Sequence, residues 1–302
     1  MSTSPLLAGL GALVAAAASW TTGPPLPEPR TEVAAAVLGK RIVVVGGFLE
    51  SGANSRRADA YDTTRNTWER LPDLPVSVDH AAAASWRGRV VVVGGYGADR
   101  APLRAAFVFD GIRWGTLPRP PEERAAAAAA ATSDGRVLVV GGVTRNGLAK
   151  TALELDLRTR RWRTVRGPRP REHLAATALG GRVYAVGGRL AGYDTNLSTV
   201  EAYDARRNSW SRAPDLPDAR GGTGATAIAG RIVSVGGESP DGTTKTVYAL
   251  RRPGSRWHRL PDLPTPRHGL GVVTLGGRVW VIAGGPKPGL TVSGTVESLR
   301  LP

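Results

Sequence analysis

The sequence predicts an all-β fold, a six-bladed β-propeller, because two markers recur in step along the 302 residues. Successive copies of either marker lie 46 to 49 residues apart, close to the length of one propeller blade. The first marker is a pair of glycines, found at Gly46-Gly47, Gly94-Gly95, Gly141-Gly142, Gly187-Gly188, Gly236-Gly237 and Gly284-Gly285. The second marker is a tryptophan, found at Trp20, Trp68, Trp114, Trp162, Trp210 and Trp257.

Each repeat unit is expected to hold four strands. Residues 175–179 and 182–186 are two runs of small and β-branched side chains around a glycine turn, as in a hairpin that is buried on both faces. The glycine pair then ends the second strand, where the backbone must turn in a crowded place. Residues 199–204 form the third strand. The fourth carries Trp210, and a proline-rich link, residues 214–217, leads to the next unit.

These residues resemble the kelch family, in which paired glycines end the second strand and a large residue precedes a tryptophan by seven positions. Tyr61 with Trp68 and Tyr203 with Trp210 follow that spacing, and the Leu-Pro link recurs at residues 71–75 and 260–264. The resemblance covers residues 18–302, which we interpret as one six-bladed kelch propeller. It is specific for the fold and implies little about function.

The phase of the repeat predicts how the ring closes. Trp20 is followed by Leu26-Pro27, as Trp68 is by Leu74-Pro75, so the chain begins with a fourth strand. Residues 295–299 match the third strand of an earlier unit. We therefore expect the last blade to be completed by the N-terminal strand, which removes an exposed sheet edge.

Residues 1–17 precede the propeller and are a possible signal peptide. The apolar run over residues 6–14 is short for a membrane span and suits the core of a leader, and small residues follow it. Export predicts a secreted, periplasmic or cell-surface protein without stable membrane insertion. No Lys or Arg precedes the apolar run, so a cytoplasmic location is the alternative.

Composition narrows the partner class. The net charge of +15 favours anionic partners, although arginine-rich and alanine-rich coding is an alternative source of that charge. Basic residues are not interleaved with free aromatic residues, so we expect no specific nucleic-acid partner. The absence of cysteine excludes disulfides, thiolate metal sites and cysteine nucleophiles.

The functional face is predicted from loop length. The loops between the second and third strands are long and dissimilar, whereas the other turns are short, and variable loops on a rigid scaffold usually carry function. These loops span residues 48–59, 96–103, 143–150, 189–198, 238–244 and 286–293.

Two kinds of candidate site residue lie where the chain enters the first strand of each blade. Five blades present an arginine, either a ligand-binding ring at the channel mouth or a structural part of the repeat: Arg30, Arg124, Arg171, Arg220 and Arg267, with Val78 in the second blade. Two residues further on stand Glu32, His80 and His173, either general acid and base groups or hydrogen-bonded lining residues. Because these three come from different blades without a compact ligand motif, we expect no metal and no cofactor.

The hypothesis drawn from these features is a non-catalytic, monomeric kelch propeller that binds a ligand or a protein. Its channel mouth and long loops would receive an anionic small molecule, a glycan or an acidic protein segment. The alternative is a sugar mutarotase or epimerase for an acidic sugar such as sialic acid, since exported mutarotases of that class are six-bladed kelch proteins. Carbohydrate binding therefore stays open beside protein binding, and the sequence leaves the question of catalysis undecided.

Overall fold

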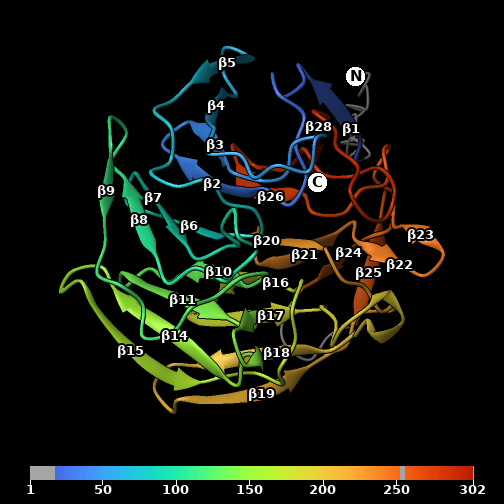
Figure 1. Cartoon of the computed structure of the whole chain (residues 1–302). Coiled ribbons are helices and arrows are strands. Elements are labelled where there is room, and N and C mark those ends of the chain that lie inside the picture. The colour runs from blue at the N-terminus through green and yellow to red at the C-terminus, as the bar shows by residue number, and fades with distance from the viewer. Residues whose placement is uncertain (1–17, 252–255, 302) are drawn as a thin grey trace, which may run out of the picture.

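The computed structural model describes residues 18–251 and 256–301, and the possible signal peptide at residues 1–17 lies outside them. The described residues form six four-stranded antiparallel sheets arranged as blades around a common centre, which confirms the predicted propeller (Figure 1). In these described ranges no helix is long and apolar enough to cross a membrane.

Each sheet is one blade, and its strands follow one another from the centre outward. The first three blades consist of β2 (Ala34–Leu38), β3 (Arg41–Val45), β4 (Ala58–Asp62), β5 (Thr67–Arg70), β6 (Ala82–Trp86), β7 (Arg89–Val93), β8 (Ala106–Phe109), β9 (Trp114–Thr116), β10 (Ala128–Ala131), β11 (Arg136–Val140), β14 (Thr151–Asp156) and β15 (Arg161–Arg166). The last three consist of β16 (Ala175–Leu179), β17 (Arg182–Val186), β18 (Val200–Asp204), β19 (Ser209–Ala213), β20 (Gly224–Ile228), β21 (Arg231–Val235), β24 (Val247–Leu250), β25 (Trp257–Leu260), β26 (Gly271–Leu275), β27 (Arg278–Ile282), β28 (Val296–Arg300) and β1 (Trp20–Gly23).

The sixth blade closes the ring as the repeat phase predicts. Strand β1 pairs with β28 in antiparallel register, with Trp20 opposite Leu299 and Gly23 opposite Val296. The two ends of the chain therefore share one sheet. Strand β1 is the fourth strand of the sixth blade and pairs with the edge of β28 that would otherwise be exposed. The sequence prediction of closure by the N-terminal strand is confirmed.

The repeated tryptophans connect neighbouring blades. The Trp68 indole N–H donates a hydrogen bond to the Pro24 carbonyl oxygen at 2.9 Å, and the Trp210 indole bonds the Arg166 carbonyl oxygen at 2.7 Å. The Trp20 indole reaches the Pro261 carbonyl oxygen at 3.0 Å and so repeats the contact across the closure. Each indole thus covers apolar surface and also satisfies a carbonyl of the link before it.

The glycine pairs fulfil their expected role, with a shift of one residue in the last blade. Gly46 and Gly47 have φ values of 63° and 95°, and in the sixth blade the matching values of 60° and 98° belong to Ala283 and Gly284. Gly285 instead lies against His268, because a Cβ on Gly285 would lie 2.6 Å from the His268 Nε2 atom. The prediction that Gly284-Gly285 forms the sixth pair is therefore wrong by one position.

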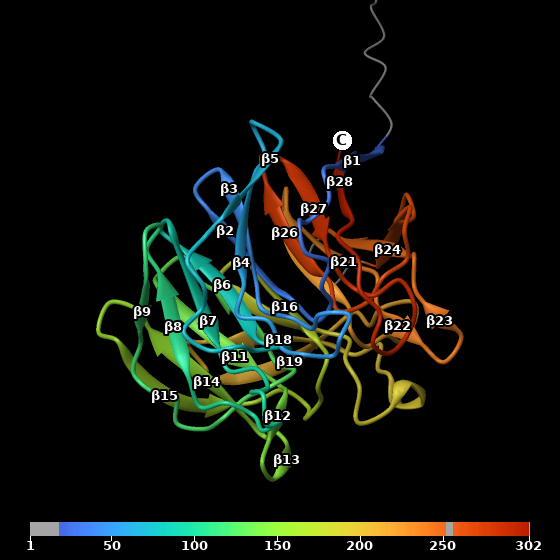
Figure 2. The same cartoon turned by 45° about the horizontal axis from the view of Figure 1, so that its top comes forward.

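The long loops between second and third strands share one face with the links that enter the first strands. Isolated backbone bridges join the two, for example Thr31 to Phe48 and Glu172 to Arg189. The loops carry the small hairpins β12 (Val143–Thr144) with β13 (Gly147–Leu148) and β22 (Glu238–Ser239) with β23 (Gly242–Thr243), and the short 3-10 helix η1 (Tyr193–Thr195). Figure 2 shows both hairpins projecting from the body of the molecule. We call this side the mouth face.

Candidate functional site at the channel mouth

The five repeated arginines are buried in their blades and do not line the channel mouth. Each is at most 1% exposed. Arg267 represents the group: its guanidinium donates to the carbonyl oxygens of Ala283 at 2.9 Å and Thr265 at 2.9 Å, and to the Glu297 carboxylate at 2.5 Å. The carboxylate partners of the five are Asp59 for Arg30, Glu122 for Arg124, Glu201 for Arg171, Asp218 for Arg220 and Glu297 for Arg267.

The carboxylate partners come from two places in the repeat. In three blades the acid lies at the same position of the third strand: Asp59 opposite Val44, Glu201 opposite Ala185 and Glu297 opposite Val281. In the third and fifth blades it precedes the arginine by two residues. The second blade has Val78 in place of the arginine and Phe107 at the third-strand position, so both members of the pair are apolar there.

This placement corrects the hypothesis of an arginine ring that binds anions. Buried charges are tolerated when they are paired and hydrogen-bonded, and these five guanidinium groups already meet that condition within the protein. Apart from the Nε atoms of Arg30 and Arg124, their donors are directed to carbonyl, carboxylate and hydroxyl oxygens of their own blades. We therefore assign the arginines to the scaffold, the structural alternative at these positions, and leave them out of the functional site.

The residues two positions beyond each arginine form a closed ring of backbone around the channel entrance. The His80 N–H donates to the Glu32 carbonyl oxygen at 3.0 Å, and the His173 N–H donates to the Ala126 carbonyl oxygen at 3.0 Å. Ala126, Gly222 and Gly269 make the same contact, and at the last junction the Val33 N–H donates to the Gly269 carbonyl oxygen at 3.3 Å. All six members have left-handed backbone conformations, with φ between 50° and 60°: Glu32, His80, Ala126, His173, Gly222 and Gly269.

Glu32, His80 and His173 converge inside this ring, as the repeat phase suggested. The His80 Nε2 atom lies 2.9 Å from the His173 Nε2 atom and 3.3 Å from the Glu32 Oε2 atom. Their side chains are only 9% to 12% exposed. One potential ligand atom from each residue lies within 4.8 Å of the others, so the structure gathers a group able to hold a metal ion where the sequence gave no reason to expect one.

A second layer of charged side chains surrounds the three. The His80 Nδ1 atom bonds the Asp79 carboxylate, which also accepts from Arg100 at 2.8 Å. The His173 Nδ1 atom lies 3.2 Å from the Glu172 Oε1 atom. His268 lies on the far side of Glu32, with 3.2 Å between its Nδ1 atom and the Glu32 Oε1 atom.

Arg189 and Glu238 join this layer from the long loops. The Arg189 guanidinium contacts Glu172 at 3.3 Å and Glu238 at 2.6 Å, and both residues directly follow a glycine pair. Our sequence analysis missed both of them and also the role of His268. The signal was the glycine marker itself, because the residue after each pair bridges to the link at the channel mouth.

The protonation of the cluster follows from burial and from these neighbours. Burial would raise the pKa of Glu32, but His80, His268 and His173 hold that pKa well below its usual value. Burial would lower the pKa of His80, yet Glu32 and Asp79 raise it. Burial lowers the pKa of His173, and the charge on His80 adds to that effect. A proton in this cluster therefore resides on His80 rather than on His173.

The cavity at the cluster is small. Its volume is about 100 Å³, and its lining includes Glu32, His80, His173 and Thr223. Pockets for organic ligands are usually about 300–1,000 Å³, so this space suits an ion or a few water molecules better than an acidic sugar. The acid and base roles suggested for Glu32, His80 and His173 remain a prediction, and the arginines proposed to hold a sugar carboxylate are engaged elsewhere.

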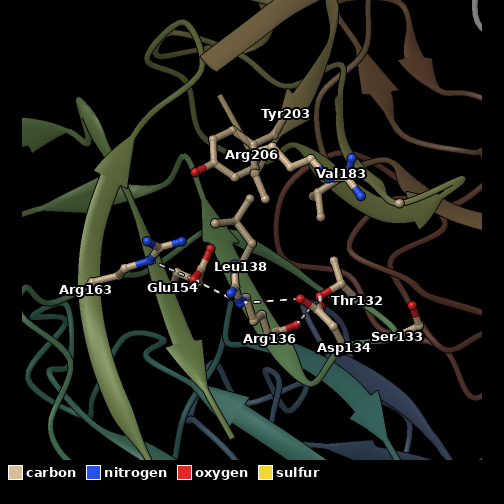
Figure 3. Close-up of a pocket in the computed structure, with 12 residues that line it drawn as sticks. Thr132, Ser133, Asp134, Arg136, Leu138, Glu154, Arg163, Val183, Tyr203 and Arg206 are labelled. Atoms are coloured by element: carbon tan, nitrogen blue, oxygen red, sulfur yellow. Dashed lines mark hydrogen bonds and ion pairs between the residues drawn. The ribbon is translucent and has the colours of Figure 1, made fainter. Parts of the chain in front are cut away.

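A larger hollow of about 560 Å³ lies between the third and fourth blades, beside the short turns and away from the mouth face (Figure 3). Four of its five charged side chains are paired with each other. Glu154 accepts from Arg163 at 2.8 Å and lies 3.7 Å from Arg136, which in turn contacts Asp134 at 3.4 Å. None of the candidate site residues predicted from the sequence lines this hollow.

Comparison with known proteins agrees with this architecture and defines the class. The chain matches the family model described as the KLHDC2/KLHL20/DRC7 Kelch-repeats domain over residues 15–188 and 114–285. The chain therefore belongs to the kelch-repeat family.

Individual relatives are similar over part of their length. The chain is 32% identical over 144 residues to Kelch repeat and BTB domain-containing protein 13 of Homo sapiens, which covers 46% of this chain and 31% of that protein. It is 28% identical over 145 residues to Kelch-like protein terF of Aspergillus terreus, covering 45% and 32%. The chain thus matches about a third of the length of these relatives. Among solved structures, one described as "Structure of YjhT" superposes with a TM-score of 0.78 at 16% identity, covering 91% of this chain and 95% of that chain, which shows a shared fold.

Proposed function

We propose that this kelch propeller binds an acidic segment of a protein partner on its mouth face. Kelch relatives support a protein-binding role for the propeller. The observation that carries the proposal is an anchor formed by Phe48, Tyr96 and Arg100. The Arg100 guanidinium carbon lies 4.9 Å from the Phe48 ring centre and 4.8 Å from the Tyr96 ring centre.

The anchor has the composition of a binding hot spot. Tyrosine and arginine are enriched among residues that dominate interface energies, and aromatic rings hold a guanidinium in a fixed orientation. Asp79 fixes the other side of Arg100, whose side chain nevertheless remains 54% exposed. A fixed, exposed guanidinium can meet a carboxylate of the partner through two parallel hydrogen bonds.

Exposed apolar side chains also lie on other long loops of the mouth face. Leu190 and Leu290, from loops of the fourth and sixth blades, are 37% and 52% exposed. Tyr193 lies under the Arg189 guanidinium at 5.1 Å. These contacts and the net charge of +15 favour a segment that combines acidic and apolar residues.

The test is a selection from a phage-displayed library of random 12-residue peptides on the immobilised protein. We expect enriched peptides to contain Asp or Glu beside an apolar residue. Synthetic copies of those peptides should bind Arg100→Ala at least about 10-fold more weakly than the wild type, since a buried charge-assisted contact is typically decisive in an interface.

The matched control is Arg113→Ala, because Arg113 is also an exposed arginine, 86% accessible, and lies in a short turn of the second blade away from the mouth face. Binding of the selected peptides to Arg113→Ala should equal binding to the wild type. Equal affinity for wild type and Arg100→Ala, or a selection without enrichment, would refute the proposed surface.

A further inference from the structure

The three converging residues occupy positions where side chains are costly. Glu32, His80 and His173 have φ values of 53°, 50° and 51° in the left-handed region, and the equivalent positions of two other blades carry Gly222 and Gly269. A left-handed conformation is unfavourable for a non-glycine residue, because its Cβ approaches the following carbonyl oxygen. The fold accepts glycine at this point of the repeat, so the three polar side chains are not required by the turn itself.

Both histidines have an acidic side chain beside their Nδ1 atoms. The His80 Nδ1 atom carries its hydrogen, because the acidic partner there, Asp79, is a carboxylate and can only accept. The His173 Nδ1 atom likewise faces Glu172 at 3.2 Å. In each case the acidic residue directly precedes the histidine in the chain. Carboxylates behind the Nδ1 atoms leave both Nε2 atoms directed at each other, which is the usual arrangement of metal-binding histidines.

Two of the three separations between ligand atoms match coordination by one ion, and the third, between His173 and Glu32, is within 4.8 Å, so binding would draw these two side chains closer together. Two ligand atoms bound to zinc at about 2.0–2.2 Å, with angles of about 90–110° between them, lie about 2.8–3.6 Å apart. The His80 Nε2 atom is 2.9 Å from the His173 Nε2 atom and 3.3 Å from the Glu32 Oε2 atom. We propose that Glu32, His80 and His173 form a binding site for one divalent first-row transition metal ion of the zinc type on the channel axis.

The neighbouring groups orient the carboxylate ligand. The His268 Nε2 atom lies 3.0 Å and 3.1 Å from the carbonyl oxygens of Lys287 and Gly289 and therefore donates to them. Its Nδ1 atom lies 3.2 Å from the Glu32 Oε1 atom, which leaves Oε2 for the metal. His268 is a positioning residue in this site and does not touch the ion.

The site has both access and room for a further ligand. The three side chains are 9% to 12% exposed toward a cavity of about 100 Å³ at the mouth face. Three protein ligands leave at least one coordination position of a zinc-type ion to water or to a carboxylate. This site adjoins the Arg100 anchor, because Asp79 contacts both His80 and Arg100, but zinc binding is measured without a peptide and tests the site separately.

A shared proton is the competing occupant. The same 2.9 Å separation fits a hydrogen bond from a protonated His80 to His173. The two occupants differ in what they predict: a metal site takes up zinc with defined stoichiometry, releases protons and loses the ion to a chelator, whereas a pair that holds only a proton shows no stoichiometric zinc binding.

The experiment is isothermal titration calorimetry at pH 7.5, in which Zn²⁺ is added to the full chain. The protein carries no histidine tag, and EDTA is used to remove bound metal and is then removed itself. We expect one Zn²⁺ per chain. His80→Ala and His173→Ala should each weaken binding at least about 100-fold, and Glu172→Gln about 10- to 100-fold. Alanine is a native residue at this turn, as Ala126 shows, so both alanine variants are expected to fold.

The control is His258→Ala, because His258 is an exposed histidine on β25 outside the cluster and its removal should leave zinc binding unchanged. As a readout without substitutions, Co²⁺ added to the wild type should give the visible absorption of a nitrogen- and oxygen-coordinated ion, and Zn²⁺ should abolish it. The proposal is overturned if the wild type binds no Zn²⁺ at 100 µM, or if binding persists undiminished in His80→Ala and His173→Ala.

Discussion

Two positions of the repeat, only two residues apart in the chain, have opposite roles in this propeller. The arginine position is nearly uniform among the blades, and its five side chains are buried with their charges paired. The position two residues on varies from glycine to histidine, and its polar members meet on the channel axis. Uniformity around the ring therefore marks the scaffold, whereas variation at a point of convergence marks the candidate site.

The largest effect in this comparison is expected from an arginine. Arg267→Ala should lower the free energy of unfolding by about 3–5 kcal/mol, because it leaves the Glu297 carboxylate, 3% exposed, without its cation. Urea denaturation followed by tryptophan fluorescence measures this loss. The control is Arg300→Ala, an exposed arginine on β28, which should stay within about 0.5 kcal/mol of the wild type. A loss below 1 kcal/mol for Arg267→Ala would show that the buried arginine is dispensable.

The second blade offers a sharper test, since it already replaces the ion pair with Val78 and Phe107. Transferring that pattern to the fourth blade gives Arg171→Val with Glu201→Phe. Either single change leaves a charge without its partner and should cost about 3–5 kcal/mol. The double variant should recover at least about 2 kcal/mol relative to the sum, measured as the coupling energy of a double-mutant cycle. Additive losses would mean that the apolar pair of the second blade cannot replace the ion pair of the fourth blade.

The repeat explains which features could be predicted from the sequence. Strand order, ring closure and the mouth face depend on periodic markers, and the structure confirms them. The repeat spacing does not indicate whether a side chain at a link points into its own blade or towards the channel. The partners of the arginines show why: Asp59 lies 29 residues after Arg30, whereas Asp218 lies two residues before Arg220. The one indication that the arginines are buried was that the second blade has apolar residues, Val78 and Phe107, at the positions of both the arginine and its carboxylate partner.

The candidate site was partly predictable for the same reason. Equivalent positions of different blades meet at the axis, so Glu32, His80 and His173 could be placed near one another from spacing alone. Their exact neighbours could not, because Arg189 and Glu238 come from loops whose paths differ in every blade.

A smaller effect is expected at the variable position. His173→Gly relieves a left-handed conformation worth about 1–2 kcal/mol and removes part of a buried polar cluster, so the free energy of unfolding should change by less than about 1 kcal/mol. Urea denaturation in the presence of EDTA measures this change in the free energy of unfolding without a contribution from bound metal. A loss as large as that of Arg267→Ala would erase the distinction between scaffold and site.

The smallest effect is expected at a third kind of position, uniform but exposed. In the first four blades the turn between third and fourth strands begins with an aspartate, and the Asp62 carboxylate accepts from the Thr64 hydroxyl at 2.7 Å and from the Arg65 N–H at 3.0 Å. The Thr64 hydroxyl, the Arg65 N–H and the Thr64 N–H together lower the pKa of Asp62 to about 2. The unfolded value is about 3.9, so the stabilisation is complete above that pH and disappears as the pH falls through about 2.

Asp62→Asn should therefore have a slightly lower thermal midpoint than the wild type at pH 7, and the difference should vanish near pH 2. Thr64→Val removes the first of the donors and should move the loss of stability to higher pH. A difference between Asp62→Asn and the wild type that is constant from pH 7 to pH 2 would show that the carboxylate charge is irrelevant there. A residue repeated at an exposed position would then indicate turn geometry alone. A repeated charge would indicate ion pairing only where its position is buried.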